Sequence, residues 1–252
     1  MIIVRTLGRL GNIFLCVSTA LEYCVRNNID FSNIRVCCDN IKDECYRKIL
    51  FSFKNIPYPS NIQNYTIIKG HFVYTKFLPN NNIIDNNGTG LHSLKFLDNI
   101  SNPSNVLFDK VFIKYLHNID KYRDLFIDYD YLDMIKSNYS FISDPNCLVW
   151  NIRHGDISTS QEEIDSVVNN IINKKYNKHF IYVISNDIDK CKILLSKYNN
   201  IDIRYHDIVN PYHDVLLISL CKNLIFAKGT FTRCAFYLSK SIQNVEYIKN
   251  KY

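Results

Sequence analysis

Glycine is scarce in this sequence, with 7 among 252 residues, and there are only 6 prolines. This scarcity excludes collagen and low-complexity disorder, which need many more of both residues. Because glycine is used so sparingly, each one is expected where the backbone adopts a conformation that other residues avoid. Four of the seven follow candidate strands, namely Gly8, Gly11, Gly155 and Gly229.

Paired cysteine motifs and long apolar runs are also missing. The nine cysteines are scattered, with no C-x-x-C pair, so neither a zinc ligand set nor a disulfide framework is indicated. Their odd number fits a reducing compartment. The apolar run that opens the chain is too short for a signal peptide or a membrane anchor. We therefore expect a soluble, cytoplasmic protein without stable membrane insertion.

Arginine is rare, with 9 against 21 lysines, so an arginine within a motif carries more weight than a lysine. The formal net charge of +6 is compatible with an anionic ligand. A basic module that stacks nucleic-acid bases on its 18 tyrosines is an alternative. However, the sequence has no basic stripe and no nucleic-acid motif, so no nucleic-acid partner is expected.

The first part of the chain is organised unevenly. Residues 1–4 are typical of a short buried strand, followed by a glycine turn and a helix from Asn12 onward. Residues 55–105 are rich in asparagine and favour irregular structure with short strands. Apolar residues in 107–140 recur at a mostly helical spacing. This part therefore opens with a strand, turn and helix but has no regular pattern in its middle.

The last hundred residues alternate between strands and helices. The apolar pattern predicts strands at 148–152, 180–184, 201–205 and 223–227, and helices at 160–173, 187–198, 214–221 and 230–239. Such alternation favours an α/β fold with a parallel sheet covered on both faces. In these sheets ligands bind at the carboxyl ends of the strands. Arg153, Ser185 to Asp187 and Gly229 to Thr232 follow such ends.

Two of the glycine turns contain candidate anion-binding groups. In Gly8-Arg9-Leu10-Gly11-Asn12, two glycines allow a ligand to approach the backbone amides at a helix start, although a simple tight turn explains them equally well. After the strand at 148–152, Arg153 can donate two hydrogen bonds to a diphosphate. Alternatively, Arg153 is a surface residue paired with Asp156.

Two later turns also have two interpretations each. Ser185-Asn186-Asp187 is most simply a helix N-cap, but its acceptors could also bind a nucleobase or a ribose. The turn Gly229-Thr230-Phe231-Thr232 offers hydroxyls and helix-start amides to a second anion. In the alternative reading, Thr230 only caps the last helix.

Taken together, these segments resemble the inverting α-1,2-fucosyltransferases of glycosyltransferase family 11. The family motifs G-x-L-G-N-Q, H-x-R-R-x-D, F-S-D-D and D-L-Y-L-M-S-x-C-K-x-x-I-x-A-N-S-T-F-S-W-W have counterparts here in the same order. The last motif is matched at Asp214, Leu217, Ser219, Cys221, Lys222, Ile225, Ala227, Thr230 and Phe231. Residues 55–140 show no match.

The resemblance implies a GT-B-like α/β fold of two Rossmann-like lobes with parallel sheets and a donor cleft between them. Residues 1–140 would form the acceptor-side lobe and residues 141–252 the lobe that binds GDP-fucose. The acceptor would be a glycan, and no metal or other cofactor is expected. The residues expected to bind the donor are Gly8, Arg9, Gly11, Asn12, Asn151, Arg153, His154, Ser185, Asn186, Asp187, Gly229, Thr230, Phe231 and Thr232.

The resemblance also suggests catalytic roles. Arg153 would stabilise the leaving GDP, Asn12 would face the fucose or a phosphate, and Asp156 would act as the base or orient the arginine loop. The sequence departs from the family where Asn151 replaces a histidine and His154 replaces the second arginine. Protonated His154 or a nearby cation, Arg9, Lys228 or Arg233, would have to replace the lost charge. The alternative is a degenerate protein that binds a nucleotide sugar or glycan without turnover.

Overall fold

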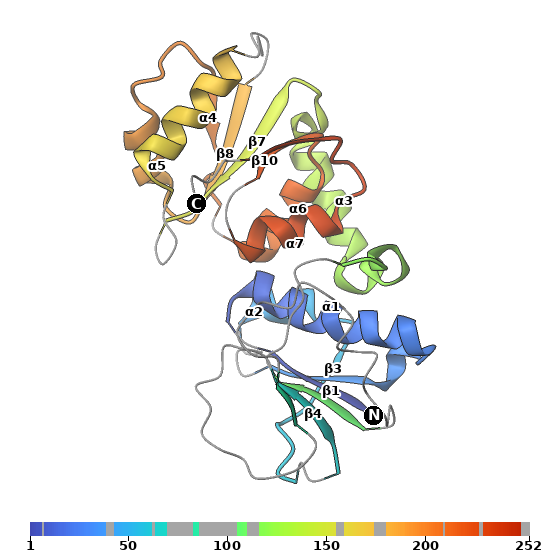
Figure 1. Ribbon diagram of the computed structural model, residues 1–252. Helices are drawn as coiled ribbons and strands as arrows, with labels where there is room; N and C mark the ends of the chain where they lie inside the picture. Colours follow the sequence, from blue (N-terminus) through green and yellow to red (C-terminus); the bar gives the residue numbers. More distant parts are fainter. Residues whose placement is uncertain are drawn as a thin grey trace. The chain divides into compact units, whose positions relative to one another are not determined.

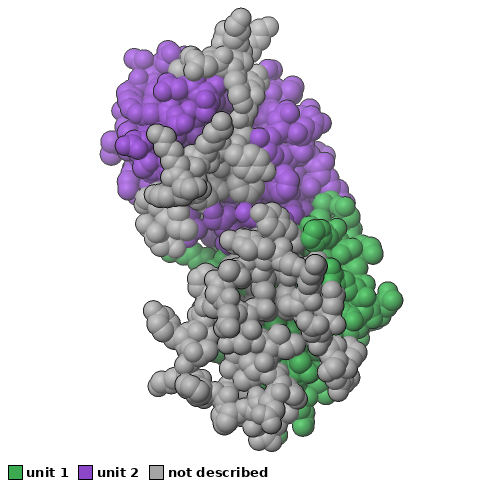
Figure 2. Space-filling view, in the orientation of Figure 1, with its two compact units in different colours: residues 1–128 green, residues 129–252 purple. Residues whose placement is uncertain are grey.

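The computed structural model describes residues 1–6, 8–38, 43–61, 64–69, 83–85, 105–109, 116–154, 159–173, 180–208, 210–226 and 229–247. The chain divides into two compact units, residues 1–128 and 129–252 (Figure 2). The sequence places the division after residue 140, whereas the structure groups α3 (Tyr129–Asn138) with unit 2. The ring of Tyr131 on α3 stacks on Tyr212 of unit 2, with 5.9 Å between ring centroids.

Unit 1 contains a parallel sheet of six strands in the order β3-β2-β1-β6-β4-β5. The strands are β1 (Ile2–Arg5), β2 (Ile34–Cys37), β3 (Lys54–Asn55), β4 (Thr66–Lys69), β5 (Ile83–Asp85) and β6 (Val106–Asp109). In β6, at an inner position of the sheet, all four residues are buried. Such continuous burial is typical of strands in a parallel sheet.

Helix α1 (Leu10–Asn27) lies beside this sheet together with the short α2 (Glu44–Ile49) (Figure 1). The prediction of a mostly helical segment at 107–140 is wrong at its start, because residues 107–109 belong to β6. Further along, the chain forms 3-10 helices at 119–121 and 123–126, and then α3. In Val106–Asp109, pairing with β1 and β4 overrides the apparent helical spacing.

Unit 2 contains a parallel sheet of five strands in the order β11-β10-β7-β8-β9. The strands are β7 (Cys147–Ile152), β8 (Phe180–Ser185), β9 (Ile203–Tyr205), β10 (Asn223–Phe226) and β11 (Asn244–Tyr247). Figure 1 shows α4 (Gln161–Asn173) and α5 (Ile188–Leu195) on one face of the sheet, and α3, α6 (Pro211–Ser219) and α7 (Thr230–Leu238) on the other. The predicted alternation of strands and helices in a parallel sheet is confirmed.

Local sequence signals explain where the helices of unit 2 begin. In the predicted capping box of α4, Ser160 N donates to Glu163 and Glu163 N donates to the Ser160 hydroxyl. Helix α6 begins three residues earlier than predicted, because Asn210 caps it and Pro211 occupies its first position. The last strand, β11, is absent from the sequence prediction.

The nine cysteines all carry free thiols, and eight of them are buried. Burial raises the pKa of the Cys24 and Cys147 thiols to about 12. In the described part of the chain, no helix combines the length and the apolar character needed to cross a bilayer.

Glu22 is a fully buried carboxylate on α1. It accepts hydrogen bonds from the backbone N–H groups of His117 and Asn118 at 3.0 and 2.7 Å. The Asn118 side-chain amide and the Tyr122 hydroxyl also donate to it, at 2.8 and 2.7 Å. Glu22 therefore attaches the segment around residues 117–122 to the first helix of unit 1.

Replacing Glu22 with glutamine should lower the free energy of unfolding by about 3 kcal/mol, because buried donors lose a charged acceptor. Urea unfolding followed by circular dichroism measures this loss. The control is Glu44→Gln, since Glu44 is 67% exposed and forms only a surface ion pair with Lys48 at 3.0 Å. The control should change the free energy by less than about 0.5 kcal/mol. Equal effects of the two substitutions would contradict this role of Glu22.

Candidate functional site

Arg153 and Gly229 come together at the carboxyl edge of the sheet in unit 2. Arg153 directly follows β7, and Gly229 directly precedes α7, which follows the neighbouring strand β10. A Cβ atom placed on Gly229 would lie 3.0 Å from Nη1 of Arg153. Gly229 also has a φ of +108°, which side-chain-bearing residues rarely adopt. The close approach and the backbone conformation both favour glycine here.

The start of α7 adds further positive potential next to this guanidinium. Gly229 occupies the N-cap position, so the cap residue offers no side-chain oxygen to the first amides of the helix. The first turn of α7 contains no acidic residue. An arginine beside a helix N-terminus is a suitable environment for an anionic group such as a phosphate. The two motifs that the sequence marks as anion-binding are thus adjacent.

Asn151 connects the strands beneath these turns. Its side-chain Nδ2 donates to the Ile184 carbonyl of β8 at 3.1 Å, and its Oδ1 accepts from the Thr232 hydroxyl at 3.0 Å. Asn151 and Thr232 are both buried. Their polar groups therefore join β7 to β8 and α7, and the Thr232 hydroxyl serves this internal bond. This arrangement argues against a direct phosphate contact by Thr232.

His154 and Asn186 join the turns that follow β7 and β8. The backbone N–H of His154 donates to Asn186 Oδ1 at 3.0 Å, and Asn186 Nδ2 donates to the His154 carbonyl at 2.8 Å. The His154 ring is buried, and its Nε2 lies 3.4 Å from the Cys191 sulfur. Sequence reasoning missed Cys191, because it lies within a helix and carries no motif.

Burial lowers the pKa of His154, Lys190 lowers it further, and Asp187 partly opposes this effect. The imidazole is therefore neutral at pH 7. A neutral, buried ring argues against the idea that protonated His154 replaces the second arginine of the family motif.

The prediction that Ser185-Asn186-Asp187 forms a helix N-cap is confirmed. The Asp187 carboxylate accepts from the Lys190 N–H at 3.1 Å and caps α5. The Ser185 hydroxyl accepts from the Asp187 N–H at 3.1 Å. The side chains of all three residues in this turn thus make contacts inside unit 2, and the structure leaves their predicted contact with a nucleoside untested.

The Gly8 turn of unit 1 follows β1, as predicted. Gly8 has a φ of +81°, and a Cβ there would lie 2.6 Å from Asn12 Nδ2. Arg9 occupies the N-cap position of α1 with an extended backbone, and its carbonyl accepts from the N–H of Asn12 at 2.9 Å. Gly11 is buried within the first turn of the helix. The turn therefore folds around the Asn12 side chain.

Within unit 2, the structure brings together the predicted residues of three segments. These are the end of β7 and its turn (Asn151, Arg153 and His154), the turn after β8 (Ser185 to Asp187), and the start of α7 (Gly229 and Thr232). Thr230 and Phe231 form the first turn of α7. Asp156, the candidate base, lies outside the described residues, as do Gly155 and Lys228. The meeting of the Gly8 turn with the turns of unit 2 in a donor cleft stays a prediction.

Removing the Thr232 hydroxyl should destabilise unit 2. Thr232→Val keeps the shape of the side chain but leaves the buried side-chain Oδ1 of Asn151 without its donor, at an expected cost of about 1–2 kcal/mol. Urea unfolding of the full chain measures it. Thr19→Val is the control, because this buried hydroxyl donates to the Leu15 carbonyl of its own helix at 2.7 Å and so bonds within one element. If Thr232→Val lowers the free energy of unfolding no more than the control does, the hydrogen bond between Thr232 and Asn151 does not stabilise unit 2.

The lowered pKa of His154 should make stability depend on pH. The unfolded chain binds a proton at His154 near pH 6.5, whereas the folded chain resists it, so stability falls as pH drops below about 6.5. The change in unfolding free energy between pH 7.5 and 5.5 should be smaller in His154→Gln. His117→Gln, at an exposed position, is the control for the loss of an imidazole at the surface. Identical slopes in all three proteins would exclude a neutral buried His154.

Known structures share this fold. POFUT1 in complex with GDP aligns with a TM-score of 0.54 at 9% identity, over 99% of this chain and 98% of that one. The fucosyltransferase NodZ from Bradyrhizobium aligns with a TM-score of 0.54 at 10% identity, over 94% of this chain and 93% of that one. A family 9 glycosyl transferase from Veillonella parvula aligns with a TM-score of 0.51 at 10% identity, covering 100% and 88%. The predicted GT-B-like α/β fold with two Rossmann-like lobes is confirmed.

Curated protein sequences give no significant match to the chain. A family model does match, however, and it covers the part of the sequence that holds β7 to β11 and the turns around Arg153 and Gly229. The predicted resemblance is thereby confirmed for this part: residues 148–251 match the model of glycosyl transferase family 11.

Proposed function

We propose that this chain is an inverting fucosyltransferase that moves L-fucose from GDP-fucose to a hydroxyl group of a glycan. The observation that carries the proposal is the approach of Arg153 to Gly229 at the start of α7, inside the segment that matches family 11. Solved structures with the same fold include POFUT1 in complex with GDP-fucose and the α-1,6-fucosyltransferase NodZ soaked with GDP-fucose.

The linkage and the acceptor belong to the same proposal. We propose an α-1,2 linkage to galactose or a similar sugar, because the motif around residues 214–231 resembles that of the inverting fucosyltransferases that include the α-1,2 branch. NodZ is an α-1,6-fucosyltransferase, so the shared fold does not favour one linkage over another.

The chemistry follows from the charge that develops during transfer. As the bond between fucose and the diphosphate breaks, negative charge grows on the β-phosphate. The Arg153 guanidinium and the first amides of α7 would donate to that oxygen and stabilise the transition state more than the ground state. These fixed donors can replace a metal ion, and we therefore propose that the transfer needs none.

The remaining residues fall into two groups. Asn12 and Thr230 are proposed to contact the donor, and Asp156 to accept the proton of the acceptor hydroxyl. Asn151, His154, Ser185, Asn186, Asp187 and Thr232 use their side chains inside unit 2. We propose that these six position the phosphate-binding turns, and that any contact they make with the donor comes from their backbone.

A second candidate is a protein that binds a nucleotide sugar without transferring it. It is favoured by one observation, the neutral and buried His154 at the place where the family has a second arginine. Release of GDP from GDP-fucose in the presence of a panel of glycan acceptors supports the transferase. Binding of GDP-fucose without release across the panel supports the second candidate.

We propose a cytoplasmic location for the chain. The support is that none of its nine cysteines forms a disulfide, as expected in a reducing compartment.

The proposal predicts GDP binding in the micromolar range, equivalent to about 8 kcal/mol. Arg153→Ala should weaken it by about 100-fold, because two charge-assisted hydrogen bonds to phosphate are lost. Isothermal titration calorimetry measures both. Arg204→Ala is the matched control, since Arg204 lies in the same unit but pairs with Asp202 at 2.7 Å on the surface.

The control should bind GDP like the wild type. Absence of GDP and GDP-fucose binding in the wild-type protein would end the proposal. Salt-sensitive binding of single-stranded nucleic acid in a filter assay, without GDP binding, would instead support a nucleic-acid module.

A further inference from the structure

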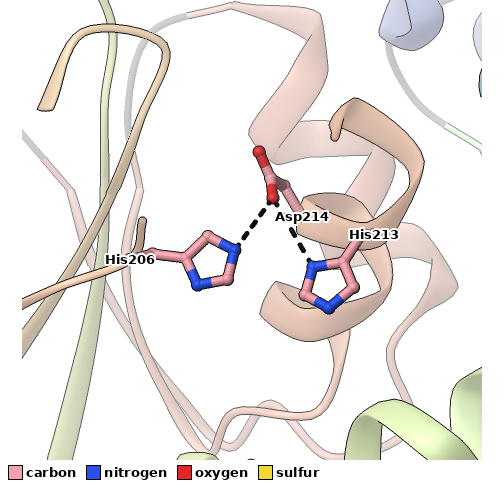
Figure 3. A group of neighbouring side chains, drawn as sticks. All are labelled: His206, His213 and Asp214. Carbon is pink, nitrogen blue, oxygen red and sulfur yellow. Dashed lines mark ion pairs between the residues drawn. The ribbon is translucent and has the colours of Figure 1, made fainter. Parts of the chain in front are cut away.

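Two histidines and an aspartate converge in unit 2 (Figure 3). His206 follows β9, and His213 and Asp214 lie in the first turn of α6. The Asp214 Oδ1 atom is 3.3 Å from His206 Nε2 and 3.7 Å from His213 Nδ1. The exposed fractions of the three residues are 1%, 4% and 7% for His206, His213 and Asp214. Within the described ranges, this is the one group of histidine, cysteine or acidic side chains with metal-binding spacing.

The backbone fixes the positions of these three residues. The His206 N–H donates to the Val183 carbonyl at 2.9 Å, which extends the pairing of β9 with β8. Asn210 accepts from the N–H groups of Tyr212 and His213, both at 3.1 Å, and so sets the start of α6. The convergence therefore rests on a strand end and a capped helix, both regular elements.

The atoms that face one another have no hydrogen-bond partners. His206 Nε2, His213 Nδ1 and Asp214 Oδ1 are all buried and form no hydrogen bond. Buried polar atoms in folded proteins nearly always form hydrogen bonds. Here three of them lie around one point with ion-pair contacts to one another but no hydrogen bond, which indicates a missing partner. A cation would satisfy all three at once.

The partner of the other His206 nitrogen suits a metal ligand. The Tyr182 hydroxyl lies 2.9 Å from His206 Nδ1. Burial raises the pKa of Tyr182 well above its usual value, so the phenol stays protonated, and its oxygen can accept from a protonated Nδ1. In that tautomer Nε2 directs its lone pair toward Asp214. Metal-binding histidines are usually oriented in this way by a hydrogen bond at the second nitrogen.

We propose that His206 Nε2, His213 Nδ1 and the Asp214 carboxylate bind a Zn²⁺ ion. Two imidazoles and one carboxylate are common zinc ligands. Bonds of about 2.0–2.1 Å in a tetrahedron place neighbouring ligand atoms about 3.4 Å apart. The two contacts of Asp214 Oδ1, at 3.3 and 3.7 Å, are close to this value, and all the ligand atoms lie within 4.8 Å of one another. Three protein ligands leave the fourth position for water. The ion would join the end of β9 to α6 and is separate from the metal-free chemistry proposed at Arg153.

The experiment uses tag-free, full-length protein. The protein is treated with a chelator, dialysed against one equivalent of ZnSO₄ and then against buffer, and its metal content is measured by mass spectrometry. The wild type should retain about one Zn²⁺ per chain, and its Tm should rise by about 5 °C over the chelated form. Co²⁺ in place of Zn²⁺ should give the visible absorption of a tetrahedral site.

The variants His213→Gln and Asp214→Asn should each lose most of the zinc and the rise in Tm. His117→Gln, which removes an exposed histidine of unit 1, should retain both. Circular dichroism of each variant checks that it is folded. The comparison of zinc-loaded and chelated wild type tests the site without any substitution. A wild type that retains no zinc, or folded variants that retain as much as the wild type, would overturn the proposal.

Discussion

The turns at the carboxyl edge of the sheet in unit 2 are held in place by the side-chain amide of Asn151. Asn151, at the end of the central strand β7, binds the neighbouring strand β8 through its nitrogen and helix α7 through its oxygen. Because both bonds are buried, water does not compete for them. They fix the spacing between the strand end that carries Arg153 and the helix start that carries Gly229. The family motif that this segment resembles has a histidine at this position, and in this chain Asn151 forms an internal connection there.

The same pattern recurs in the neighbouring turn. The side chain of Asn186 and the backbone of His154 exchange two hydrogen bonds, and the His154 ring packs against Cys191. Polar residues that resemble ligand-binding motifs in the sequence are thus used to hold the loops. In unit 2, Arg153 and the start of α7 are the groups best suited to bind an anion. The proposed phosphate contacts therefore involve only a few of the residues in the family motifs.

Much of this could be predicted from the sequence of unit 2. The continuous apolar strands, the capping box at Ser160 and the cap at Asp187 all depend on neighbouring residues, and local patterns report them well. The strand at Val106–Asp109 was missed because its pairing partners lie about a hundred and about forty residues away. The hydrogen bonds of Asn151 to Thr232 and of His154 to Cys191 join residues that are far apart in the sequence, so no local pattern of residues predicts them.

The reactivity of the buried thiols can be used to measure the unfolding of this chain. The thiolate is the form that reacts with alkylating reagents, and a buried thiol with a raised pKa forms it rarely. The eight buried cysteines are divided equally, with Cys16, Cys24, Cys37 and Cys38 in unit 1 and Cys147, Cys191, Cys221 and Cys234 in unit 2. Alkylation followed by peptide mapping would therefore record the opening of each unit separately, with no added label.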